Sequence, residues 1–477
     1  MLVLDWSITV VCTCCSAAAL EVCYDELGCF EDLPPWGGTA QRPAAILPWS
    51  PQEVGTRFLL FTQKNRYYQT LLSLRGFSIQ ASNYGGRRKT RFVIPGLVVT
   101  DDEDWPQEMC KVLLSTENVN CIAVEWKKGA RTQYAQAANN ARVVGAQVAS
   151  MLSFLMGRYK QTADKFHIIG HGVGAHAAGE AGSRTPGLAR ITGLDPAEPY
   201  FQDTDAAVRL DAGDASFVDA IHTDALPFSS GLGLGMSRPV GPPSELDAIW
   251  QGDSRFDACN HARAYLYYEE SLVQPRGFVG FPCSDSKAFA AGQCFSCPDG
   301  SCPLMGHHAD KSAGTDGVSK TKYFLNTGRT APFSRDFRVS LTLDGPSWPN
   351  PGFMYVALAG QYGTTQEHQL HVGTLVPGRT YDMLLDAELD VGRVEEVRFR
   401  WNNHILNPMR PRYGASRVAL QRGSDQETWV ALLSTPLCCP LLAALRMTWL
   451  SSFLLPSMQF CGMETVVENA VQAVPPC

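Results

Sequence analysis

A glycine-rich motif in the middle of the chain has the spacing of a nucleophile elbow. Gly170-His171-Gly172-Val173-Gly174 follows the apolar run from Phe166 to Ile169 and precedes the small-residue stretch from Ala175 to Gly182. In such an elbow, flanking glycines allow a sharp strand-to-helix turn that lifts a central serine above the sheet. The central residue here is Gly172, so neither an alkoxide nor a covalent acyl intermediate can form at this position.

A glycine-rich turn after a strand can also bind a nucleotide phosphate. The dinucleotide fingerprint requires Gly-x-Gly-x-x-Gly and an acidic residue about 20 positions further on, and that pattern is not evident here. The residues that follow favour the elbow. Asp195 stands at the end of the predicted strand Arg190 to Leu194, and His261 follows Cys259 and Asn260. The order elbow, aspartate, histidine is that of the α/β-hydrolase triad. Alone, each residue could be an ordinary turn or surface residue.

From Phe58 to about Asp224, short apolar runs alternate with helical patterns. This alternation predicts an α/β domain with a mostly parallel sheet that would position these residues. Between the third and fourth strands, Val144, Val148, Met151, Leu152 and Leu155 fall on one face of a helix. The predicted strands are Phe58–Thr62, Arg91–Ile94, Val119–Trp126, Phe166–Ile169 and Arg190–Leu194.

Beyond about Ser334 the pattern changes to alternating apolar and polar residues, which predicts a separate β-sandwich with strands near 337–343, 353–358 and 397–401. The segment 429–458 is strongly apolar and interrupts this region. A membrane helix needs about 20 predominantly apolar residues, and the prolines and Arg446 interrupt most windows of that length. A transmembrane anchor is therefore the less favoured interpretation, although it stays open.

Composition sets the remaining limits. The 477 residues are 45% hydrophobic and 18% charged, enough for two packed domains. A net charge of −7 lacks the overall basic excess typical of nucleic-acid-binding proteins.

Residues 1–19 have an apolar centre followed by small residues, as a secretory signal peptide does, although Asp5 and the lack of Lys or Arg depart from the pattern. The 16 cysteines include close pairs that suit disulfide-closed loops in a secreted, extracellular protein.

These residues together resemble the pancreatic lipase family, and within it the pancreatic lipase-related proteins. The resemblance runs over nearly the whole chain and rests on Glu21–Tyr24, Pro35–Thr39, Gly179–Gly182, Gly193–Pro199, Ile221–Asp224 and Cys259–His261. It implies a lipase domain over residues 20–334 and a colipase- or lipid-binding sandwich of the PLAT type over 335–477. It places the family's triad on Gly172, Asp195 and His261, and its oxyanion-hole donors on the backbone N–H groups of Leu97 and Val173. Pro95 stands where the family has a histidine, and its fixed φ could displace the loop that carries Leu97.

The resemblance also implies a structural Ca²⁺ held by the carbonyl oxygens of Ala206 and Arg209 and the carboxylates of Asp211 and Asp214. Oxygen ligands suit this hard cation. A solvated acidic loop is the alternative. Family-like disulfides would join Cys23–Cys29, Cys110–Cys121, Cys283–Cys294, Cys297–Cys302 and Cys461–Cys477. The family's lid segment is absent between Gly241 and Leu246, which leaves Cys259 without its partner.

Three functions follow from these observations. The first is a lipase-like pseudoenzyme of triacylglycerol metabolism that engages colipase or a lipid interface without hydrolysing esters. The second is an active triacylglycerol lipase, through another nucleophile such as Ser183 or because the sequence is misread. The third is a membrane-tethered lipid-binding protein anchored by 429–458. The missing lid and the apolar insert could both be errors in the gene model.

Overall fold

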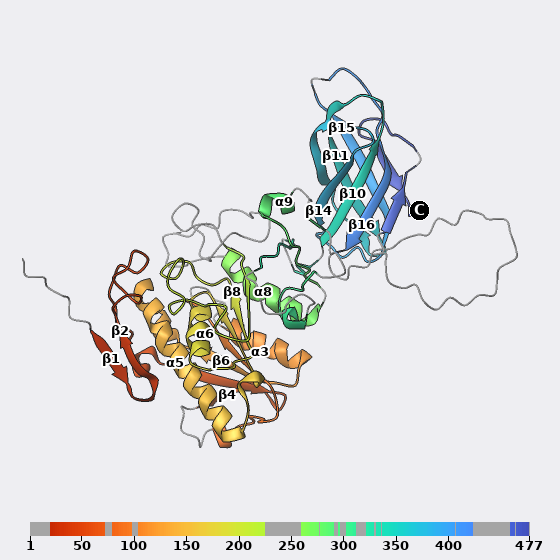
Figure 1. Cartoon of the computed structure of the whole chain (residues 1–477). Coiled ribbons are helices and arrows are strands. Elements are labelled where there is room, and N and C mark those ends of the chain that lie inside the picture. The colour runs from red at the N-terminus through yellow and green to blue at the C-terminus, as the bar shows by residue number, and fades with distance from the viewer. Residues whose placement is uncertain are drawn as a thin grey trace, which may run out of the picture.

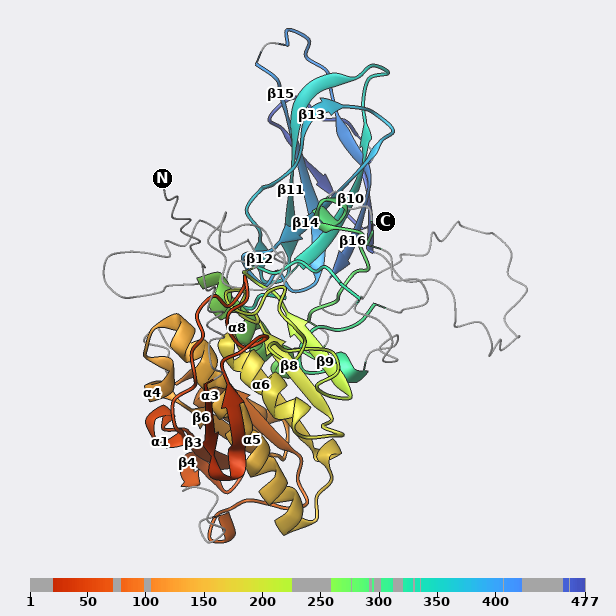
Figure 2. The same ribbon diagram turned by 60° about the vertical axis from the view of Figure 1, so that its left-hand side comes forward.

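The computed structural model describes residues 20–71, 79–97, 104–224, 259–275, 277–290, 294–295, 302–311, 321–328, 331–334, 336–405, 407–422, 458–462 and 464–476. These residues form an α/β unit, to which α8 belongs, followed by a β-rich unit (Figures 1 and 2). The predicted signal peptide, most of the apolar insert and the stretch of the missing lid lie outside the described residues, as does the side chain of Cys259.

A seven-stranded sheet forms the centre of the α/β unit, in the order β4-β3-β6-β5-β7-β8-β9. The strands from β5 to β9 pair in parallel, whereas β3 pairs antiparallel with β4 and β6. All five predicted strands are confirmed, and the sequence reasoning missed β4 and β9. The bounds are β3 Arg57–Thr62, β4 Asn65–Leu71, β5 Thr90–Ile94, β6 Asn120–Glu125, β7 Phe166–His171, β8 Arg190–Leu194 and β9 Phe217–Ile221.

Helices cover both faces of this sheet, which explains why its inner strands are buried, largely apolar runs rather than alternating patterns. The long helix α5 (Tyr134–Tyr159) packs on α6 (Val173–Ser183), and their buried side chains share one core with Phe92 and Ile122 of the sheet. On the opposite face, α3 (Trp105–Thr116) and α8 (Cys259–Val273) share a second core with Val93 and Ile169. The five apolar residues predicted to line one face of α5 are all buried.

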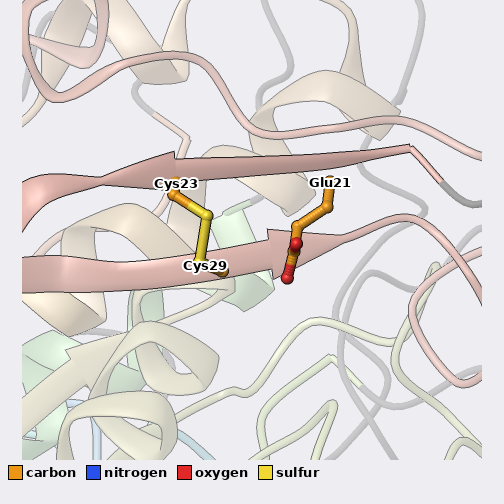
Figure 3. Close-up of side chains that lie close together, drawn as sticks. All are labelled: Glu21, Cys23 and Cys29. Carbon is orange, nitrogen blue, oxygen red and sulfur yellow. A yellow bond between two sulfur atoms is a disulfide. The ribbon is translucent and has the colours of Figure 1, made fainter.

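Short elements complete this unit. They are β1 Glu21–Tyr24, η1 Asp25–Leu27, β2 Gly28–Glu31, α1 Pro51–Val54, α4 Lys127–Ala130, η2 Ala163–Lys165, α9 Ser286–Ala290 and η4 Ala309–Lys311. Glu21 lies close to Cys23 and Cys29 in the β1–β2 hairpin, but the two sulfur atoms form a disulfide and are therefore not available as thiolate ligands (Figure 3).

The β-rich unit consists of two antiparallel sheets around one core. One has the order β14-β10-β16-β17, and the other has the order β12-β11-β15-β18, with β13 also paired to β11. Val339, Val356, Phe399 and Val418 belong to the shared core, which explains the alternating pattern seen in the sequence. The bounds are β10 Asp336–Asp344, β11 Asn350–Gly360, β12 Gly363–Thr364, β13 His368–Leu375, β14 Thr380–Asp386, β15 Val394–Asn403, β16 Gly414–Arg422, β17 Met458–Cys461 and β18 Val471–Val474.

A buried carboxylate on α8 holds the segment that leads into the β-rich unit. Glu270 accepts hydrogen bonds from the backbone N–H groups of Phe333 (2.6 Å) and Ser334 (2.8 Å). One turn earlier, the Tyr267 hydroxyl is 2.8 Å from Thr327 Oγ1. The helix that begins with Cys259 and His261 is thus joined directly to the connection between the two units.

Three predicted disulfides are present: Cys23–Cys29, Cys110–Cys121 and Cys283–Cys294. Cys302 and Cys461 are also disulfide-bonded, while their predicted partners Cys297 and Cys477 lie outside the described residues. Within the described part of the chain, no helix is long and apolar enough to cross a membrane.

Candidate functional site

The elbow motif forms the turn between β7 and α6. Gly172 has φ +54° and ψ −121°, and its N–H donates to the carbonyl of Leu194 at 2.9 Å. The flanking glycines are required by close backbone approach, because a Cβ on Gly170 would lie 2.4 Å from the Gly174 oxygen and one on Gly174 would lie 2.4 Å from the Ile94 oxygen. The backbone therefore has a tight strand-to-helix turn with a side-chain-free residue at its apex.

Asp195 follows β8 and is completely buried. Its Oδ2 is 2.6 Å from His261 Nδ1, and its Oδ1 accepts hydrogen bonds from the backbone N–H groups of Thr223 (2.9 Å) and Asp224 (3.2 Å). Burial alone would raise the pKa of Asp195, but the hydrogen bond and charge of His261, with the Thr223 N–H and the charge of His222, together hold the pKa below its ordinary value. The carboxylate is thus ionised and fixes one nitrogen of the imidazole.

The other nitrogen of His261 faces the apex of the elbow. A Cβ atom placed on Gly172 would lie 2.7 Å from His261 Nε2 and 3.2 Å from Cε1. The imidazole therefore reaches into the space that a side chain at this position would need. The structure brings Gly172, Asp195 and His261 together, and their triad roles remain predictions.

The Pro95 loop lies against the elbow. A Cβ on Gly96 would lie 2.8 Å from the His171 oxygen and 3.4 Å from the Val173 nitrogen. Trp126 Nε1 donates to the Pro95 oxygen at 2.8 Å in a fully buried contact, which holds the loop in place. Leu97 packs against the core beneath the elbow. The two residues predicted as oxyanion-hole donors, Leu97 and Val173, are therefore neighbours of Gly172, and their role stays a prediction.

Two buried histidines beside the elbow were missed by the sequence reasoning. His171 Nε2 donates to the backbone oxygen of His261 at 3.0 Å, and the two rings lie 4.2 Å apart between centroids. Burial and the neighbouring His261 lower the pKa of His171 to about 3. Its place next to Gly172 in the motif was the only available signal.

The second is His176 on α6. Its Nδ1 accepts from the backbone N–H of Leu210 at 3.0 Å, so its Nε2 carries the proton and donates to the Ala197 oxygen at 3.0 Å. The ring stacks on Phe201 at 3.7 Å. This neutral histidine ties the elbow helix to the turn after Asp195 and to the acidic loop described next.

The predicted calcium ligands Ala206, Arg209, Asp211 and Asp214 lie on that loop. Asp214 Oδ2 accepts the backbone N–H of Asp211 at 2.8 Å, so the two carboxylates lie at one turn. Burial first, and then the charge of Asp211, raise the pKa of Asp214 to about 6. The Arg209 guanidinium approaches Asp211 Oδ2 at 3.1 Å. A half-buried pair of carboxylates whose repulsion is only partly balanced is a set of oxygen donors that fits a hard cation.

The family model described as "Lipase" matches residues 20–243 and 244–333. The human (Homo sapiens) protein named inactive pancreatic lipase-related protein 1 is 45% identical over 97% of this chain and 97% of its own. Its dog (Canis lupus familiaris) counterpart is 49% identical over 86% of this chain and 92% of its own. Human pancreatic triacylglycerol lipase is 41% identical, with 97% of each chain covered.

Proposed function

This chain belongs to the pancreatic lipase family, and we propose that it is an exported, lipase-like protein of triacylglycerol metabolism that engages lipid without forming an acyl-enzyme. The observation that carries the proposal is Gly172 at the apex of the elbow. In a serine triad, the histidine accepts the proton of the nucleophile as that nucleophile attacks the ester. Here Asp195 would still orient His261 as a general base, but no hydroxyl stands at Gly172 to give up a proton.

The names of two relatives point in the same direction, since both are described as inactive. Ser183 offers no substitute nucleophile. It lies at the far end of α6, about 16 Å of helix from Gly172 at 1.5 Å per residue, and its hydroxyl bonds to the Glu180 oxygen. In a comparable triad, loss of one member leaves only about 10³- to 10⁴-fold catalysis over water. That rate is far below what a working lipase needs.

A labelling experiment tests the missing nucleophile directly. The purified chain should not react with a fluorophosphonate probe and should not hydrolyse a triacylglycerol emulsion with colipase above the buffer rate. Gly172→Ser should react with the probe, because the Asp195–His261 pair is already in place to activate the new hydroxyl. The His261 ring must first move back slightly to make room for the new side chain. Gly172→Ala is the matched control and should stay unlabelled. Lipase-like turnover by the unaltered protein would overturn the proposal.

Lipid engagement is the second part of the proposal. We assign the lipase domain to residues 20–334 and a PLAT-type sandwich, with the apolar insert 429–458 within it, to residues 335–477. This sandwich would bind colipase or the lipid interface. Its support is the similarity to lipase relatives over 97% of the chain and the two-sheet architecture. Flotation with triacylglycerol droplets, with and without colipase, should move the protein to the lipid layer. A protein that stays in the aqueous layer in both cases would contradict this part.

Export is supported by the disulfides, which persist in oxidising compartments. Residues 1–19 would be the signal peptide, so cells expressing the full chain should release a protein that starts near Leu20. Retention of the uncleaved chain in a membrane fraction would favour the tethered alternative.

We assign the structural Ca²⁺ to the carbonyl oxygens of Ala206 and Arg209 and to the carboxylates of Asp211 and Asp214. An ion bound only by the folded state at 100 times its dissociation constant stabilises the protein by about 2.7 kcal/mol. Added Ca²⁺ should therefore raise the Tm relative to EDTA, and Asp214→Asn should abolish that increase. An equal increase in the variant would show that the ion binds elsewhere.

A further inference from the structure

A group of cations lies at the edge of the sheet where its parallel strands begin. It consists of the exposed Arg87, Lys89, Arg158, Lys160 and Lys165 together with the half-buried Arg88, and we call it the basic edge. Its residues come from the loop before β5, from the last turn of α5 and from the connection between α5 and β7.

The loop before β5 and the segment around residues 159–165 lie side by side. Gln161 Nε2 donates to the Arg88 oxygen at 2.9 Å, and the rings of Tyr84 and Tyr159 pack at 4.8 Å. Thr90 and Phe166 are register partners in the parallel pair β5–β7, so Lys89 and Lys165 stand next to each other immediately before the two strands.

The acidic groups near this edge are already engaged. Asp164 accepts a hydrogen bond from Lys165 Nζ at 3.0 Å. Glu117 is bound by Arg91 at 3.0 Å and by His307 at 2.6 Å. Within the described part of the chain, the other five basic-edge cations thus form no ion pair with a carboxylate, in a protein whose net charge is −7.

One of these cations also has an unmet hydrogen-bond donor. Arg88 Nη1 is buried and has no hydrogen-bond partner. A buried guanidinium nitrogen without an acceptor is costly unless a ligand supplies one, and an oxyanion is the acceptor that suits it. Because this atom is buried, a surface ligand would reach it only after the Arg88 side chain turned outward, and the proposal rests on the five exposed cations of the basic edge.

We propose that the basic edge binds a sulfated polysaccharide. Such a chain carries closely spaced sulfate groups, which a row of Lys and Arg side chains can neutralise together. Single-stranded nucleic acid fits less well, because Tyr84 and Tyr159 pack on each other and neither is exposed as a platform for base stacking. A membrane surface also fits less well, since no exposed large hydrophobic side chain among the described residues belongs to this edge.

The basic edge lies opposite the candidate functional site. Gly172 and Asp195 follow the ends of β7 and β8, whereas the basic edge precedes the starts of β5 and β7. A strand of five or six residues spans about 17–20 Å, so a polysaccharide at one edge leaves the other free. Contact with such a polymer outside the cell depends on the proposed export, but binding in solution does not depend on export or on any lipase property.

Immobilised heparin tests the proposal with the full chain. The protein should be retained at about 0.15 M salt and elute at higher salt, as expected when several cations release counterions. The triple variant Arg87→Glu, Lys89→Glu and Lys160→Glu should bind soluble heparin at least about tenfold more weakly, a loss of about 1.4 kcal/mol. A matched triple variant, Lys128→Glu, Arg410→Glu and Arg417→Glu, changes the net charge equally at exposed positions away from this edge.

Thermal melts should first establish that both triple variants are folded. The proposal fails if the matched variant loses as much affinity as the basic-edge variant, since that would show a general charge effect. It also fails if fully desulfated heparin binds equally well. Tighter binding to single-stranded DNA or to phosphatidylserine vesicles than to heparin would assign the edge to one of those anions instead.

Discussion

The candidate site has two parts, the elbow at Gly172 and the Asp195–His261 pair, and each contains a residue with positive φ. Gly172 and Asp195 both have positive φ, +54° and +43° respectively. Glycine adopts such angles readily, whereas other residues do so at a cost of about 1–3 kcal/mol unless the surroundings hold them there. Asp195 is held by three hydrogen bonds, and Gly172 needs no support.

The difference shows that the elbow and the Asp195–His261 pair are separable. A serine at the apex of the elbow would be strained, and its replacement by glycine relieves the backbone while the glycine frame keeps its shape. The aspartate cannot be lost so simply, because its carboxylate also satisfies the backbone N–H groups of Thr223 and Asp224. The Asp195 side chain is thus part of the hydrogen-bonded framework of the fold, whereas the residue at the apex of the elbow contributes no side chain to it.

Removing the Asp195 carboxylate should have the largest effect on the free energy of unfolding. Asp195→Ala should lower the free energy of unfolding by about 4 kcal/mol, because it leaves buried donors without an acceptor. Urea unfolding measures it. Asp203→Ala is the control, since Asp203 also has positive φ (+59°) but is exposed. Equal costs for the two variants would mean that backbone strain, and not hydrogen bonding, sets the value.

An effect of intermediate size concerns His171, which joins the two halves through its bond to the His261 backbone. Its folded-state pKa of about 3 lies below the ordinary 6.5, so between these values the unfolded chain takes up a proton that the native state does not. Above pH 6.5 the neutral His171 imposes no penalty on the native state. As the pH falls from 6.5 towards 3, this residue lowers the free energy of unfolding by about 1.4 kcal/mol per pH unit.

The variant His171→Gln keeps an N–H donor and removes this titration. Between about pH 6 and pH 4, its free energy of unfolding should fall less steeply than that of the unaltered protein, by about 3 kcal/mol over the interval. Parallel slopes for the two proteins would show that His171 is protonated in the native state.

The smallest expected effect is at the apex of the elbow. Gly172→Ala should cost about 2 kcal/mol, from positive φ and from the contact of its Cβ with His261 Nε2. In a His261→Ala background the cost should shrink by about 1 kcal/mol, since the contact is gone. Gly157→Ala, on the exposed side of α5 with open space around its Cβ, should instead be neutral or stabilising. An undiminished cost in the double variant would place all of the effect in the backbone.

The sequence predicted much of this arrangement because local patterns determine it. Strands buried on both faces read as apolar runs, and the glycines at 170 and 174 mark unavoidable backbone contacts. The edge strand β4 carries the polar and exposed residues Tyr67 and Tyr68, so no apolar run revealed it. The roles of His171 and His176 depend on partners about 21 to 90 positions away, which no local pattern encodes.

The attachment of Glu270 to Phe333 and Ser334 has a mechanical consequence. His261 and Glu270 lie on one uninterrupted helix, nine residues apart, which is a stiff rod of about 14 Å. A torque applied to the strands beyond Ser334 would act on the far end of that rod through two short hydrogen bonds. Any load taken up by the β-rich unit at a droplet surface would therefore be transmitted to the imidazole above Gly172.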